Sequence, residues 1–233
     1  QRLWADCFAR LGRSAELLED LNERIDIDPS SQQLLHQRAK LLRQLERYSE
    51  AAVDYAEMVR LGSEDDVVFI EWCATLVAAG DLEQYRQRCR ELLDRFADDA
   101  DAQLAERLAR ICTFAPDAVD DWQQPFELAE RAMAGGVGGP GKTDSYARLL
   151  YRSGKYQEAA TRLAEAPESD DERAEASKRL WLAMARFQLN QAESAQQLLQ
   201  QADAWMQENP DAYLGTKLLL AEAKGLIEPA PAK

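Results

Sequence analysis

The chain has 233 residues and a formal net charge of −14, with 28 Lys and Arg residues against 42 Asp and Glu residues. This balance argues against a nucleic-acid-binding protein, because that class normally presents a basic stripe to the phosphate backbone. Hydrophobic residues make up 46% of the chain and charged residues 30%, which predicts a folded protein with a sizeable core and not a disordered one.

The apolar runs are too short to cross a membrane. The longest are Val67–Ile70 and Trp181–Ala185, whereas a bilayer-spanning helix needs roughly 20 apolar residues. We therefore expect no membrane partner. Residues 1–8 have the pattern of the middle of an amphipathic helix and no apolar signal core, so we expect the chain to be a fragment of a longer one.

The rare residue types exclude several kinds of chemistry. His36 is the single histidine, which excludes a multi-histidine metal site and leaves no Ser-His-Asp or Cys-His system unless that residue supplies it. The cysteines form no Cys-x-x-Cys pair, so zinc and thioredoxin-like sites have no spacing signal. We expect buried thiols in a reducing, cytoplasmic compartment, with neither a metal nor a cofactor. The four cysteines are Cys7, Cys73, Cys89 and Cys112.

Acidic residues concentrate in the middle of the chain, just before helical patterns. Residues 62–140 contain 7 basic and 17 acidic residues, with acidic clusters at 64–66, 98–101 and 120–121. Hydrogen bonding to exposed amides and the helix dipole both favour carboxylates at the start of a helix. We therefore expect these clusters to be solvated capping side chains and not metal ligands.

Helical spacing predominates along the whole chain. Apolar residues recur three and four positions apart, as between Leu34 and Leu45, and no long alternation typical of a β-strand occurs. Breaks fall at Gly12, Glu46 and Gly80, each 34 residues from the last and each between two helical stretches. A period of 34 residues made of two short helices is typical of a tetratricopeptide array.

Small residues agree with this register, because paired helices must approach each other closely. Residues 45–51 and 153–159 resemble the Gly-x-Tyr-x-x-Ala turn of the tetratricopeptide repeat (TPR) family, and Pro29 matches its terminal proline. The resemblance implies an all-α fold, a right-handed α-solenoid of about six helix pairs with a C-terminal capping helix. Its close-packing alanines, twelve positions apart, are Ala39 with Ala51, Ala147 with Ala159, and Ala183 with Ala195.

The resemblance implies a single helical repeat domain over residues 1–227. In the third repeat Cys73 and Tyr85 occupy the close-packing positions, which predicts a wider helix spacing there. The fourth repeat lacks the motif residues and contains Pro116 and Pro125, so its register is not determined by the motif. In chain order the expected repeats are 1–31, 32–65, 66–99, 100–139, 140–175 and 176–210, followed by a cap at 212–227 and a disordered tail at 228–233.

A second resemblance concerns the setting of this array. Residues 129–133, residues 147–160 and the closing Leu-Leu-Ala-Glu-Ala-Lys are similar to helical arrays in large bacterial regulatory proteins, including planctomycete serine/threonine kinases. None of the signature motifs of a kinase occurs in the 233 residues. The resemblance implies that the chain is a non-catalytic regulatory arm of such an enzyme, as an alternative to an independent scaffold.

One motif points to nucleotide binding. Gly136, Gly141, Lys142 and Thr143 occupy the fixed positions of the phosphate-loop signature G-x-x-x-x-G-K-[ST]. The signature works when a buried strand precedes the loop and directs its amides toward phosphate groups. Residues 126–133 have helical spacing instead, so we favour a glycine-rich connection between two repeats and keep nucleotide binding as the less favoured alternative.

Stacked helix pairs curve, so their first helices line an inner surface where partners dock. Basic and apolar groups alternate along the first helices here, which points to a peptide or protein partner with acidic and large apolar residues. The expected groove residues are Gln33, His36, Lys40, Arg43, Val67, Ile70, Ala74, Val77, Asp144, Arg148, Tyr151, Arg152, Leu180, Met184 and Phe187.

These patterns together predict a protein-interaction scaffold without enzymatic activity. The TPR family also includes clamps that hold the C-terminal carboxylate of chaperones with paired asparagines and lysines. Asn22, Asn190 and Asn209 are the only asparagines, and none falls on an expected groove face, so we do not expect that use. Self-association into a homo-oligomer stays open.

Overall fold

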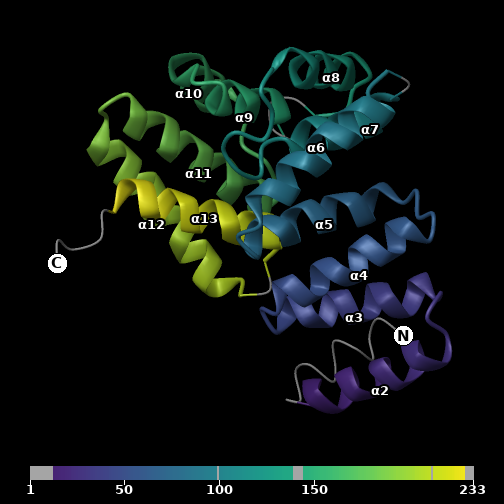
Figure 1. Ribbon diagram of the computed structural model, residues 1–233. Coiled ribbons are helices and arrows are strands. Elements are labelled where there is room, and N and C mark those ends of the chain that lie inside the picture. Colours follow the sequence, from purple (N-terminus) through teal and green to yellow (C-terminus); the bar gives the residue numbers. More distant parts are fainter. Residues whose placement is uncertain (1–12, 99, 139–143, 211, 229–233) are drawn as a thin grey trace. The chain divides into compact units, whose positions relative to one another are not determined.

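The computed structural model describes residues 13–98, 100–138, 144–210 and 212–228 (Figure 1). Within these ranges all regular elements are α-helices, which confirms the predicted all-α class. No helix in this part of the chain is long and apolar enough to cross a membrane. The helices are α2 (Ser14–Ile27), α3 (Gln32–Gln44), α4 (Tyr48–Arg60), α5 (Asp66–Ala78), α6 (Leu82–Phe96), α7 (Ala102–Ile111), α8 (Gln123–Ala134), α9 (Ser145–Arg152), α10 (Tyr156–Glu165), α11 (Glu172–Gln188), α12 (Ala192–Glu208) and α13 (Leu214–Ile227).

Contacts divide the chain into two compact units, residues 1–82 (unit 1) and residues 83–233 (unit 2). In unit 1, α2 packs against α3, α3 against α4, and α4 against α5. In unit 2, α7 packs against α8, and α9 to α12 pack one after another along the chain, as the adjacent ribbons in Figure 1 show.

Four of the turns between paired helices share one backbone conformation. Each contains a residue with a left-handed φ angle: Glu46 at 57°, Gly80 at 76°, Gly154 at 81° and Asn190 at 61°. The next residue donates its backbone N–H to the carbonyl five positions earlier, at 2.8–2.9 Å. This is the bonding pattern of a helix C-cap that ends in a left-handed residue, and it explains why glycine recurs at these breaks.

The small residues expected at the helix crossings are all in the core. Ala39, Ala51, Ala147, Ala159, Ala183 and Ala195 each have no exposed surface. Cys73 and Tyr85 are also wholly buried. Tyr85 keeps its hydroxyl paired by donating to the carbonyl of Ile111 at 2.8 Å, which is how a tyrosine occupies a position where other repeats have alanine.

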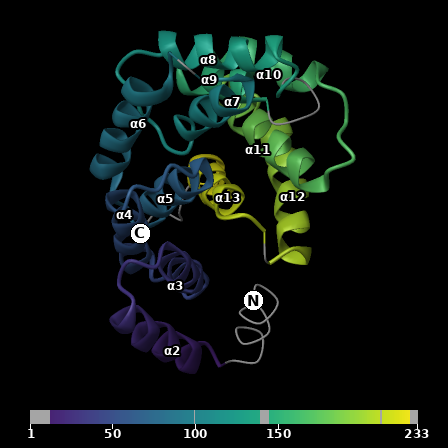
Figure 2. The same cartoon turned by 90° about the vertical axis from the view of Figure 1, so that its right-hand side faces the viewer.

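Helix α11 is the centre of the core of unit 2. Its residues Leu180, Ala183 and Met184 are wholly buried in a cluster that also includes side chains from α9, α10, α12 and α13. Helix α13 runs beside α11 and α12 (Figure 2). Helix α11 begins at Glu172, four residues before the expected repeat boundary at 176, because Asp171 caps it by accepting hydrogen bonds from two backbone amides.

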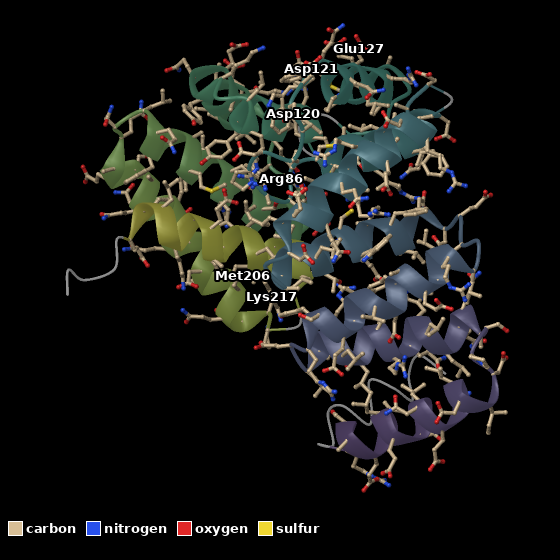
Figure 3. The ribbon with its side chains drawn as sticks, viewed as in Figure 1. Arg86, Asp120, Asp121, Glu127, Met206 and Lys217 are labelled. Carbon is tan, nitrogen blue, oxygen red and sulfur yellow. The ribbon has the colours of Figure 1, made fainter. Side chains whose placement is uncertain are left out.

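The described members of the acidic clusters behave largely as capping groups. Asp65 and Asp101 accept backbone N–H groups at the starts of α5 and α7, at 2.9 and 2.8 Å. Asp121 accepts the N–H of Gln123 at 2.9 Å where α8 begins, and Figure 3 shows Asp120 and Asp121 near this end of α8. These three contacts are the capping interactions expected for carboxylates at the start of a helix.

Candidate functional site

The first candidate site lies on α3 and α5 of unit 1. We call the side chains of Gln33, His36, Lys40, Arg43, Val67, Glu71 and Val77 the α3–α5 surface, because all of them keep solvent contact. Val67 is 40% exposed and is one of four exposed large apolar side chains among the described residues, with Ile27, Leu45 and Val53. Ile70 and Ala74, which were expected in the same groove, are buried. They therefore belong to the core that holds α5 in place and offer a partner no surface.

Glu71 is the group around which the α3–α5 surface is organised. One of its oxygens, Oε2, lies 2.7 Å from His36 Nε2 and accepts a hydrogen bond from the hydroxyl of Tyr55 at 3.1 Å. The other, Oε1, lies 3.4 Å from Arg43 and 3.9 Å from Lys40. One carboxylate therefore holds three side chains of α3 and one of α4 in fixed positions.

The charges in this cluster explain the ionisation of Glu71. Burial alone would raise the pKa of Glu71, but the hydrogen bond from His36 and the charges of Arg43 and Lys40 outweigh it and keep that pKa below its usual range. Burial raises the pKa of Tyr55, so its hydroxyl stays protonated and can donate to Glu71. Among Lys40, Arg43 and Glu71, positive groups outnumber negative groups by one.

Glu71 and Tyr55 were not among the expected site residues. Glu71 follows Val67 by four positions and precedes Ala74 by three, so its helical spacing places it on the same face. That spacing was an available signal for Glu71. Tyr55 comes from α4, the second helix of its pair, and no spacing rule on α3 or α5 includes it.

The expected groove residues of unit 2 lie mostly in the interior. Leu180 and Met184 are wholly buried and Tyr151 is 6% exposed, so these three serve the core, while Phe187 is partly buried against it. A helix register that differs by one residue turns a side chain by about 100°, which is enough to exchange an inner surface position for a core position. The core role of Leu180 and Met184 corrects the expectation that they line a groove.

Arg152 is also a structural residue. Its side chain is only 3% exposed, and its guanidinium donates to both oxygens of Glu222 on α13, at 2.5 and 2.7 Å. A third bond runs from Arg152 Nε to the carbonyl of Thr113 at 3.0 Å. The ring of Trp181 lies under the same guanidinium, with 4.8 Å from Cζ to the ring centroid. Arg152 thus ties α9 to α13.

A cavity of about 560 Å³ opens along α9 and α10. Its wall includes Arg162, which ion-pairs with Asp144 at 2.8 Å and covers the ring of Tyr146 at 4.9 Å. The positive charge of the cavity is therefore already balanced by Asp144, which was itself an expected groove residue and instead caps α9. The lining residues are Tyr146, Leu150, Gln157, Glu158, Thr161, Arg162, Glu165 and Ala166.

The phosphate-loop motif is only partly within the described residues. Gly136 has a left-handed φ of 75° and lies two residues after the last residue of α8, so a helix and not a strand precedes the loop. Gly141, Lys142 and Thr143 lie outside the described residues. Nucleotide binding thus lacks the strand that its mechanism requires.

The residues suited to metal binding do not gather in the described part of the chain. Across residues 13–98, 100–138, 144–210 and 212–228, no group of three His, Cys, Asp or Glu side chains could hold a metal ion. Cys73, Cys89 and Cys112 are buried, and Cys7 lies outside these ranges.

Comparison with known proteins identifies the fold. No family model and no curated protein matches the chain. Among solved structures, a tetratricopeptide repeat protein from Parabacteroides merdae has a TM-score of 0.59 at 10% sequence identity, over 95% of this chain and 90% of that one. YrrB, a TPR protein with an unusual peptide-binding site, has a TM-score of 0.43 at 14% identity, over 94% of this chain and 88% of that one. The C-terminal part of a TPR protein from Cytophaga hutchinsonii has a TM-score of 0.46 at 14% identity, over 99% and 96%.

The first of these similarities, together with the helix pairs, shows that the chain has a TPR-type fold. At this identity the likeness extends to the fold alone. The similarity to kinase-associated arrays stays a prediction.

Proposed function

We propose that the chain is a protein-interaction module and that its α3–α5 surface binds a peptide carrying acidic and large apolar residues. The observation that carries the proposal is the arrangement of Lys40, Arg43 and His36 around Glu71. Glu71 holds His36 and Arg43 in place beside Lys40, which limits the conformational entropy that this surface loses on binding. The TPR-type fold supports the proposal, since function on such folds lies on exposed helix faces.

Charge and exposure determine which residue meets the acidic group. Lys40 is the most exposed cation of the cluster, at 37%, and lies farthest from Glu71, at 3.9 Å. Arg43 is 12% exposed and hydrogen-bonds to Tyr55, so it mainly maintains the cluster. Lys40 therefore provides the surplus positive charge, and the exposed Val67 provides an apolar contact nearby on α5.

A selection from random peptides displayed on phage tests the proposal. We expect the selected peptides to be enriched in Asp or Glu together with Leu, Phe or Trp. Lys40→Glu should weaken binding of a selected peptide about tenfold, because it replaces attraction by repulsion at a desolvated contact. Arg60→Glu is the matched control, since Arg60 is a 69% exposed cation on α4 of the same unit and pairs with Glu57 on its own helix.

Lys40→Glu and the control Arg60→Glu should differ in their effect on peptide binding. Binding should be unchanged in Arg60→Glu, and binding by both wild type and control should weaken as salt increases. Selected peptides without acidic residues, or equal affinities of wild type and Lys40→Glu, would contradict the assignment of this surface. The scaffold role without catalysis and the role as an enzyme's regulatory arm stay predictions alongside it.

A further inference from the structure

Arg148 on α9 is a partly buried arginine of unit 2 with few partners. Its one hydrogen bond among the described residues is a 3.3 Å contact with the hydroxyl of Ser177 on α11. In the described part of the chain it forms no ion pair. The residue as a whole is partly and not fully buried. A guanidinium has five N–H donors, and most of those of Arg148 are unused.

The two nearest carboxylates are already engaged elsewhere. Glu106 accepts a hydrogen bond from Ser145 at 2.9 Å and lies 3.8 Å from Arg110 on its own helix. Asp144 pairs with Arg162 at 2.8 Å and caps α9. Their charges act on Arg148 from a distance, but neither forms a hydrogen bond with it.

A second arginine, Arg110, adds to the lack of acceptor groups for the positive charges of this region. The Nε of Arg110 on α7 is buried and has no hydrogen-bond partner. Burial, followed by the repulsion from Arg110, lowers the pKa of Arg148 to about 10. Two like charges in a partly desolvated site are unfavourable unless an anion lies between them or beside them.

Arg152 shows what a satisfied guanidinium looks like in the same surroundings. It lies one turn after Arg148 on α9 and, like Arg148, lies over the ring of Trp181. Arg152 receives both oxygens of Glu222 and a backbone carbonyl, whereas Arg148 receives one hydroxyl. Three arginines, at 110, 148 and 152, face two carboxylates, Glu106 and Glu222, which leaves one positive charge without a partner.

We infer that Arg148, beside Ser177 and the ring of Trp181, forms a binding site for one compact oxyanion, a carboxylate or phosphate group. Guanidinium groups bind both kinds of oxyanion through paired N–H donors. The hydroxyl of Ser177 can add a further hydrogen bond, and the adjacent Trp181 ring lies 5.9 Å from Arg148 Cζ. This site is in unit 2 and does not depend on peptide binding at the α3–α5 surface.

Nuclear magnetic resonance of the tryptophan indoles tests the site directly. The chain has 5 tryptophans, and Trp181 is identified as the indole N–H signal that disappears in Trp181→Phe. Sodium phosphate and sodium acetate are titrated separately at constant ionic strength, with sodium chloride as the balancing salt. We expect a saturable shift of the Trp181 signal with phosphate or acetate, and the anion that acts at the lower concentration identifies the class.

Variants separate a specific site from general charge effects. Arg148→Gln should abolish the shift. Arg90→Gln, which removes an exposed arginine of α6 in the same unit, should leave it unchanged. In a thermal melt the bound anion should raise the Tm of the wild type by about 3–6 °C at ten times its Kd, and should not raise that of Arg148→Gln.

Two results would overturn the inference. One is a Trp181 signal that phosphate and acetate move no more than chloride does. The other is an equal shift in wild type and in Arg148→Gln. The wild-type titration requires no variant to fold, so the inference stays testable even if Arg148→Gln is unstable.

Discussion

Glu71→Gln is the most informative substitution in unit 1, because it removes one charge and keeps the shape of the side chain. Glu71 is 14% exposed and shares its two oxygens among His36, Tyr55, Arg43 and Lys40. A hydrogen bond to a charged group contributes about 1.5–3 kcal/mol. Since glutamine keeps one acceptor oxygen, we expect unit 1 to lose about 2 kcal/mol of unfolding free energy at pH 7.

The pH dependence of the unfolding free energy provides a second, independent test of this prediction. The folded protein holds the pKa of Glu71 below its usual range, so the ionised form favours folding. This stabilisation is complete above the pKa of the unfolded carboxyl, about 4.3, and is lost as the pH falls through the lower folded pKa. The difference in unfolding free energy between wild type and Glu71→Gln should therefore narrow as the pH falls below about 4.

Urea unfolding followed by circular dichroism, with amide hydrogen exchange in α3 to α5, measures both effects. Glu57→Gln on α4 is the control, because Glu57 pairs with the exposed Arg60 at the surface and should change nothing measurable. The reasoning is refuted if Glu71→Gln is as stable as the wild type at pH 7. It is equally refuted if the difference persists unchanged at pH 3.

Three further outcomes follow from the packing and the turns. Arg38→Ala should lower the unfolding free energy by about 3–5 kcal/mol in urea unfolding, because it leaves the 2% exposed carboxylate of Asp54 buried without its partner. Asp54→Ala should lower it less, since the guanidinium of Arg38 can reach water. The reverse order would contradict this desolvation argument. Leu180→Ala should lower the unfolding free energy by about 2–5 kcal/mol without changing the affinity of the folded protein for a selected peptide. A loss of peptide binding without a loss of stability would instead indicate that Leu180 lines a groove. Glu46→Gly should raise the unfolding free energy by about 0.5–1 kcal/mol, and Gly154→Ala should lower it by about 1–2 kcal/mol, because both residues have left-handed φ angles. No atom lies within 4 Å of a Cβ at position 154, so the effect there comes from the backbone and not from a clash. Equal stabilities of the wild type and both variants in thermal melts would show that these turns carry no strain.

Local patterns were sufficient to predict the helices and their class. Apolar spacing and the 34-residue period depend on neighbours within one or two turns, and the left-handed turn residues at Glu46 and Gly80 fall where the period predicts them. The alanines at the crossings are buried as expected, since close helix approach requires small side chains wherever it occurs. The start of α11 differed because capping by Asp171 adds a turn that the repeat motif does not encode.

The site residues depended on contacts between distant parts of the chain. His36 and Glu71 are 35 positions apart, and Arg152 and Glu222 are 70 positions apart, so no local spacing rule joins them. Arg148 and Arg152 have the same residue type and share a face of α9, yet one is neutralised by α13 and the other is not. Only the packing of α7, α11 and α13 around α9 determines that difference, because the partner of a charged side chain is whatever the folded chain brings within a few ångströms of it.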